Sequence, residues 1–248
     1  MQERMHPHAL IDLLAQRPSD ELESMHAAAE RVIRATTALA ETGQSAVSTV
    51  MPGEDVVNAW SHYPPGDIID PEHGTQVYYH AHPEHDRGAG EHGHFHVFAH
   101  CSAPTARPDS DSGAGNAHAP ASQDDGAKHC HLIAISMNAL SQPVGLFTTN
   151  RWVTGETWLP ARDIVERVRS FRLEKREPFA ETRQWLEAMM ILFRPQIEAL
   201  IAERDARIRS RATHAADDVL ENRALNRISA VDIDLAEQVT AIERALSI

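Results

Sequence analysis

Histidine is the residue type whose number and spacing point most directly to chemistry in this chain. Twelve of the 16 histidines lie between His62 and His131. Two segments of that stretch, Tyr78 to His82 and Glu91 to His100, place histidines two residues apart. Imidazole nitrogens are common ligands of transition metals, so a cluster of them favours a metal site.

The spacing of these histidines predicts which side chains share a direction. In a β-strand, residues i, i+2 and i+4 lie on one face of the sheet, so His80 and His82 would point together. The intervening residues of the second segment, including Phe95 and Val97, would cover a core on the opposite face. The second segment carries four histidines in the same alternation: His92, His94, His96 and His100.

Pairing the two segments as an antiparallel hairpin predicts a metal site. If His82 pairs with His94, His80 lies opposite His96, and opposed side chains have Cβ atoms about 4.5 to 5.5 Å apart. Metal–nitrogen bonds of about 2.0 to 2.1 Å are within reach of such a square. We therefore expect these four histidines to be the ligands.

Three further histidines are candidate ligands with less support. A register offset by two residues would bring His92 or His100 into the set, because such an offset keeps every side chain on its face. His131 follows Cys130 at the start of the next predicted strand and could complete or border the site.

The identity of the bound group stays open at this point. All-imidazole ligands suit Fe, Zn, Cu and Ni alike, and haem is an alternative. Glu91 adjoins the second segment and could act as a general base or a further ligand, unless it is solvated at the strand start. Arg151 could hold an anionic substrate by a bidentate contact, unless it pairs with Glu156 at a structural corner.

The elements that position these residues form an α+β fold. We expect a small antiparallel sheet of about four strands, with the last two joined by a hairpin loop from Asn138 to Pro143. Residues 102–128 consist almost wholly of Ser, Ala, Pro, Gly, Asp and Asn, which predicts a disordered insertion. The expected strands cover residues 76–82, 92–100, 131–137 and 144–149.

Helices are expected both before and after the sheet segment of the chain. Residues 1–45 carry two amphipathic patterns, residues 46–158 hold the sheet, and residues 159–248 are expected to be helical and to pack on the sheet in one compact unit. Pro195 should kink a long helix within the last part. Tyr63-Pro64-Pro65-Gly66-Asp67 is typical of a rigid turn.

Composition limits the classes of partner. A formal charge of -13 would repel a phosphate backbone, so nucleic acid is not expected. No run of about 18 apolar residues is present, so no membrane span is expected. Only two cysteines occur and no signal peptide is evident, which favours the cytoplasm. A small-molecule substrate or ligand is the expected partner, and oligomerisation through the C-terminal helices stays open.

Three segments resemble an uncharacterised bacterial family described as a domain of unknown function. They read HYPPGD from His62, EHGHFH from Glu91 and LFTTNRWVTGE from Leu146, and the resemblance covers about Trp60 to Trp158. It implies that the three segments form one site, and it brings no established activity.

The leading hypothesis from the sequence is a metalloenzyme of redox or oxygenase type with an unknown substrate. A non-catalytic protein that stores, traffics or senses a metal or haem is the second hypothesis. A helical partner-binding protein with incidental histidines is the third.

Overall fold

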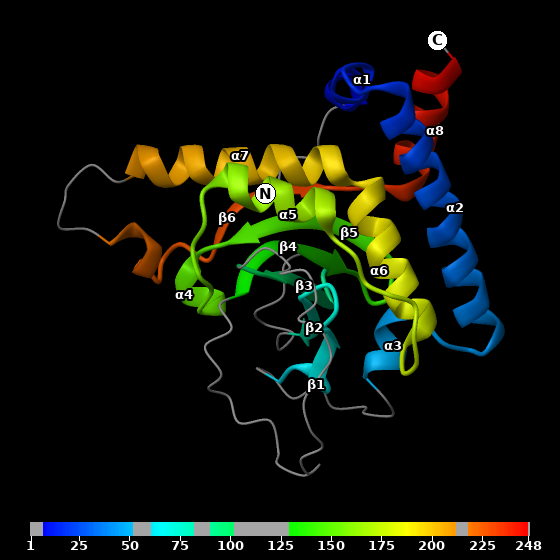
Figure 1. Cartoon of the computed structure of the whole chain (residues 1–248), viewed down its shortest axis with the longest axis horizontal. Helices are drawn as coiled ribbons and strands as arrows, with labels where there is room; N and C mark the ends of the chain where they lie inside the picture. The colour runs from blue at the N-terminus through cyan, green and yellow to red at the C-terminus, as the bar shows by residue number, and fades with distance from the viewer. Residues whose placement is uncertain (1–6, 52–60, 82–89, 102–128, 212–217, 248) are drawn as a thin grey trace, which may run out of the picture.

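The computed structural model describes residues 7–51, 61–81, 90–101, 129–211 and 218–247. It is an α+β fold built on one antiparallel sheet of six strands that lie side by side in chain order (Figure 1). The four predicted strands are β2 to β5, each found within two residues of its expected bounds. The strands are β1 (Tyr63–Asp70), β2 (Thr75–Ala81), β3 (Gly93–His100), β4 (His129–Met137), β5 (Pro143–Thr149) and β6 (Arg227–Asp232).

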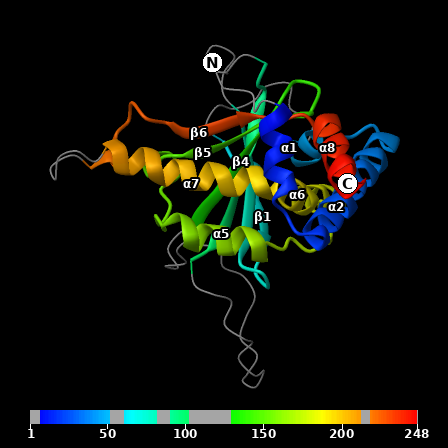
Figure 2. The ribbon, with the colours of Figure 1, turned by 90° about the horizontal axis from the view of Figure 1, so that it is seen from above.

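Helices precede and follow the first five strands in the chain. Seen from above, α5 and α7 cross one face of the sheet side by side (Figure 2), in contact with β4, β5 and β6. No helix of the described ranges is long and apolar enough to cross a membrane. The helices are α1 (Pro7–Ala15), α2 (Ser19–Glu41), α3 (Ala46–Val50), α4 (Arg151–Thr154), α5 (Ala161–Ser170), α6 (Ala180–Leu192), α7 (Arg194–Arg211), the 3-10 turn η2 (Val219–Glu221) and α8 (Leu235–Ser247).

The long helix expected around Pro195 is interrupted rather than kinked. α6 ends at Leu192 and α7 begins at Arg194, so Pro195 falls in the first turn of the second helix. A proline is tolerated there because the first backbone N–H groups of a helix have no partner within it.

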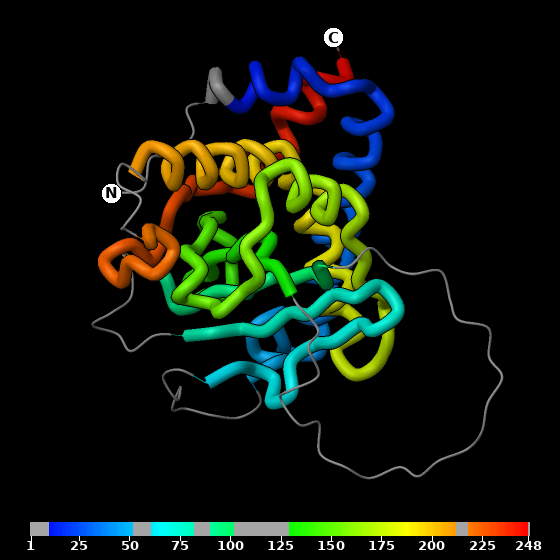
Figure 3. Tube along the Cα trace, turned by 60° about the vertical axis from the view of Figure 1, so that its left-hand side comes forward, coloured from blue at the N-terminus to red at the C-terminus, as the bar shows by residue number. Residues whose placement is uncertain are grey.

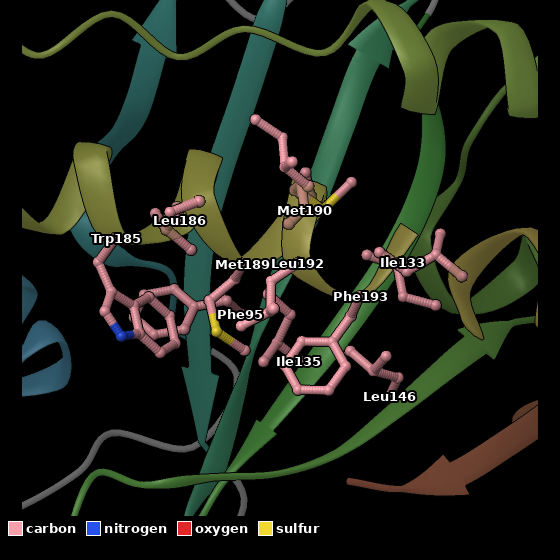
Figure 4. Packing of buried hydrophobic residues seen from close by; sticks show 14 of the residues in the cluster. Phe95, Ile133, Ile135, Leu146, Trp185, Leu186, Met189, Met190, Leu192 and Phe193 are labelled. Carbon is pink, nitrogen blue, oxygen red and sulfur yellow. The ribbon is translucent and has the colours of Figure 1, made fainter. Parts of the chain in front are cut away.

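The core lies between the sheet and the helices on its covered face. Phe95 and Val97 are completely buried, as their alternation with the histidines predicted. The ring of Phe95 lies 5.9 Å from that of Trp185 on α6, and Met189 and Phe193 continue the same cluster (Figure 4).

A second layer of helices packs outside α6. α2 contacts both α6 and α8, and α8 also contacts α1. The first and last helices of the chain, drawn in blue and red, therefore lie together (Figure 3). The helix α8 thus packs against the N-terminal helices.

The sheet has two edge strands that the sequence did not predict. The Pro-Pro-Gly segment expected to be a turn belongs to β1, whose pairing with β2 is irregular between Tyr63 and Ile68. An edge strand tolerates prolines because one row of its backbone groups needs no partner. β6 lies where only helix was expected. Its buried residues, Ile228, Ser229 and Val231, do not alternate strictly with exposed ones, so the two-residue period of a strand is not visible in the sequence.

Asp70 connects the end of β1 to the loop between α5 and α6. Its side chain is fully buried and accepts the backbone N–H groups of Glu174 at 2.8 Å and His73 at 3.3 Å. Burial alone would raise the pKa of Asp70, but the hydrogen bonds from Glu174 and His73 outweigh it and hold the pKa below its usual value. The folded state therefore favours the ionised form of Asp70, and ionised Asp70 adds to its stability.

Replacing this carboxylate should lower stability in a pH-dependent way. Asp70→Asn is expected to reduce the free energy of unfolding by about 1 to 3 kcal/mol at pH 7. Because the folded pKa lies below the unfolded value of about 3.9, the contribution is present above that pH and is lost as the pH falls through the folded pKa. Urea unfolding at pH 7 and at a pH below the folded pKa checks this, with Asp12→Asn on the exposed side of α1 as control. Equal losses in the two variants would contradict the assignment.

Candidate functional site

The face of the sheet opposite the core carries the central histidines. His80 pairs with His94 across β2 and β3, and Tyr78 pairs with His96. The expected register, with His82 opposite His94, is therefore wrong by two residues. This offset keeps every side chain on its predicted face, so His80, His94 and His96 still share one face. His82 lies outside the described residues.

The rings of these three histidines lie close together. Their centres are 5.6 Å apart for His80 and His94, 6.4 Å for His80 and His96, and 4.6 Å for His94 and His96. His94 and His96 are each only 3% exposed. The three imidazoles therefore form a compact group, in which His94 and His96 are shielded from water.

An irregularity in β4 adds His131 to the same face. Val97 pairs with Ile133 but Phe98 pairs with His131, so Leu132 is an extra residue in β4. Without this β-bulge, His131 would pair with Ala99 and face the core. The Nε2 atom of His131 lies 3.0 Å from Nδ1 of His96, in hydrogen-bond contact.

His131 is held on its other side as well. Its Nδ1 atom lies 3.2 Å from the hydroxyl of Thr149 at the end of β5. Burial lowers the pKa of His131 to about 3 and that of His96 well below its usual value, and neighbouring charges, including His94, add to both shifts. Both rings are therefore neutral at neutral pH, and a neutral imidazole keeps one nitrogen lone pair as acceptor or ligand.

Glu91 fixes the orientation of His94. Nδ1 of His94 lies 2.7 Å from Oε1 of Glu91, and Arg227 of β6 donates to both carboxylate oxygens at 2.8 and 2.6 Å. Burial would raise the pKa of Glu91, but the hydrogen bond from His94 and the charge of Arg227 lower it to about 2. An ionised carboxylate only accepts, so Nδ1 of His94 carries the proton in this contact.

A pocket of about 510 Å³ opens next to this histidine group. Tyr78 lines it, and the ring of Tyr78 lies 5.1 Å from that of His96. Phe98 and Glu156 also line it, and Glu156 accepts the backbone N–H of His131 at 2.7 Å. The pocket and the histidine group thus share a boundary.

The other predicted site residues lie elsewhere. His92 contacts the hydroxyl of Tyr79, a residue of the opposite face, at 2.8 Å. His100 lies at the far end of β3, with its ring 5.3 Å from that of His129. Arg151 donates to Asp218 and Glu221 at 2.9 Å each. The pairing with Glu156 that was considered from the sequence is not formed.

Sequence reasoning missed three residues that hold the group together. Arg227 comes from β6, an element that was not predicted. Thr149 carries no signal of its contact with His131 beyond its place in the LFTTNRWVTGE segment. Glu156 was considered only as a partner for Arg151, although it belongs to the LFTTNRWVTGE segment. That segment was the one available signal for its place in the site.

The histidine group is not a preformed metal site in its present side-chain orientations. Across the ranges that the structure describes, no three His, Cys, Asp or Glu side chains are placed so that they could hold a metal ion. What the arrangement offers chemically is a compact set of imidazoles beside a pocket, in which His96 and His131 are neutral and His94 is oriented by an ionised carboxylate.

Comparison with known proteins identifies the family. No curated protein and no solved structure matches the chain. A family described as "Domain of unknown function (DUF6969)" matches residues 26–233, which is most of the chain and includes all three recognised segments. The chain therefore belongs to the DUF6969 family.

Proposed function

We propose that this protein binds a divalent first-row transition metal through His80, His94 and His96. Metal–nitrogen bonds of about 2.1 Å place each ring centre about 3.2 Å from a shared ion, so the centres of two ligand rings are about 4.5 Å apart at a right angle and at most about 6.4 Å apart. The separations of 4.6 and 5.6 Å that His94 makes with His96 and His80 fall inside that range. The 6.4 Å between His80 and His96 is at its limit, so His80 would have to move toward His96 on binding. This spacing is the observation that carries the proposal. The rings would have to turn about their side-chain torsions for their lone pairs to meet.

The contacts behind these rings support the same proposal. Histidine ligands of metals usually donate their second nitrogen to a carboxylate, a carbonyl or water, which fixes the ring and raises its basicity. Glu91 has this relation to His94. His131, one of the less supported ligands in the sequence, contacts His96 instead, and we assign it to the outer shell.

The pocket favours catalysis over storage. Three protein ligands leave coordination positions for substrate or water. Because Tyr78 borders both His96 and the pocket, a small molecule in the pocket would lie near the ion. We therefore propose a metalloenzyme of redox or oxygenase type, with Fe, Zn, Cu or Ni as the ion. The alternative is a non-catalytic protein that binds a metal or haem for storage, trafficking or sensing.

Calorimetric titration with Zn²⁺ tests metal binding. Protein purified without a histidine tag and treated with a chelator should take up one ion per chain with micromolar or tighter affinity. No saturable uptake would refute the proposal. An absorption spectrum of the protein as purified separates haem or Cu²⁺ from colourless Zn²⁺.

A Co²⁺-loaded sample separates the enzyme from the storage protein. An open coordination position should bind added azide and change the visible Co²⁺ spectrum. A closed site should leave the spectrum unchanged, and that result would favour storage.

Glu91→Gln should weaken metal binding without unfolding the chain. The amide keeps the shape of the side chain but no longer holds His94 by a charge-assisted hydrogen bond. Loss of such an outer partner typically lowers metal affinity by about 10- to 100-fold. Zn²⁺ titration checks this, with Glu23→Gln on the exposed face of α2 as a control that removes the same charge. Wild-type affinity in Glu91→Gln would mean that the carboxylate does not position a ligand.

A further inference from the structure

Two oxygen atoms beside the pocket have no hydrogen-bond partner in the described part of the chain. They are Oε1 of Glu156 and Oγ1 of Thr154, and both residues line the pocket. Glu156 is only 7% exposed, and its other oxygen is occupied by the backbone N–H of His131. A Thr154 hydroxyl turned toward Glu156 would still leave acceptor lone pairs on both oxygens, and buried polar atoms are nearly always paired, so the two point to a missing donor.

One wall of the pocket is made of flat rings. The ring of His62 stacks on that of Tyr78, with centres 3.7 Å apart and planes inclined by 6°. The ring of Phe98 follows, 5.5 Å from Tyr78 and inclined by 26°. Flat rings pack favourably against such a lining, because aromatic pairs add to the gain from burial alone.

The charge balance of the pocket favours a cation. Burial raises the pKa of Glu156 to about 7, although the His131 N–H, Arg204 and the Thr154 hydroxyl act in the opposite direction. A positive charge bound beside Glu156 would relieve the cost of ionising it in a buried position.

We infer that this pocket binds a small, flat aromatic molecule that carries a cationic group with two N–H donors. The donors satisfy Oε1 of Glu156 and Oγ1 of Thr154, and the ring packs against Tyr78 and Phe98. The inference deepens the proposed function by naming a substrate class. It rests on the pocket alone for its binding step and needs no metal.

Benzamidine is a suitable probe, because it combines a flat ring with an amidinium group. Its binding is measured by calorimetry on chelator-treated full-length protein at pH 8, above the pKa of Glu156. The expected Kd is about 1 mM, which is realistic for so small a ligand. Glu156→Gln should raise the Kd at least about tenfold. Benzoate, of the same shape and opposite charge, should not bind.

Two controls keep the test decisive. Glu23→Gln removes an equal charge from the surface of α2 and should leave the Kd unchanged. Phe98→Leu keeps most of the side-chain volume but removes the ring, and it should also weaken benzamidine binding. This variant therefore tests the inference even if Glu156→Gln fails to fold. Equal affinity of wild type and Glu156→Gln, equal binding of benzoate, or no benzamidine binding would overturn the inference. Because no metal is present, none of these outcomes depends on the histidine site.

Discussion

His94→Ala is expected to lower the Zn²⁺ affinity at least about 100-fold, which corresponds to about 2.7 kcal/mol of binding free energy. His94 is the proposed ligand whose ring is fixed by a carboxylate, through the 2.7 Å contact with Glu91. The substitution removes one of three ligands and also leaves the Glu91–Arg227 pair without its third member. Competition with a chelating indicator dye measures the affinity.

His26→Ala is the matched control for this variant. His26 lies on α2 with its side chain 38% exposed, so the control removes one imidazole from the surface. It should bind Zn²⁺ as the wild type does. Wild-type affinity in both variants would show that His94 is not a ligand, and equal losses in both would indicate non-specific surface binding.

Gly93→Ala is expected to cost at least about 3 kcal/mol of unfolding free energy, near the upper end for overpacking. Gly93 pairs with Ala81 of β2 and Met137 of β4, so both neighbouring strands hold its backbone. A Cβ atom there would lie 2.6 Å from the carbonyl oxygen of His80 and 2.6 Å from the hydroxyl of Tyr79.

Gly145→Ala makes the same change in a strand that has room for it. The nearest atom to the added Cβ would be the carbonyl oxygen of Val231 at 3.4 Å, an ordinary contact. Its stability should stay within about 1 kcal/mol of the wild type. Urea unfolding of the two variants checks the difference. If Gly93→Ala were as stable as Gly145→Ala, the tight packing of β3 on β2 would be contradicted.

Strand positions and side-chain faces could be predicted because they follow from local alternation. Phe95 and Val97 alternate with His94 and His96, and this two-residue period fixes both the strand and its buried face. The register could not be fixed in the same way. A shift of two residues leaves all faces unchanged, so the pairing of His80 with His94 depends on the whole sheet.

The rest of the site depends on contacts between distant parts of the chain. Arg227 reaches Glu91 from a strand 136 residues later. His131 joins the histidine face because of the bulge at Leu132, and nothing in the local sequence announces that extra residue. Such features arise when strands of unequal local geometry pair, so a period-based prediction cannot contain them.

X-ray absorption at the zinc edge, on protein loaded with one equivalent of Zn²⁺, tests the central proposal most directly. The proposal predicts multiple-scattering features from three imidazoles, with Zn–N distances of about 2.0 to 2.1 Å. One of these imidazoles should be lost in His94→Ala. A spectrum with only oxygen ligands, or one unchanged by His94→Ala, would contradict a metal site built on His80, His94 and His96.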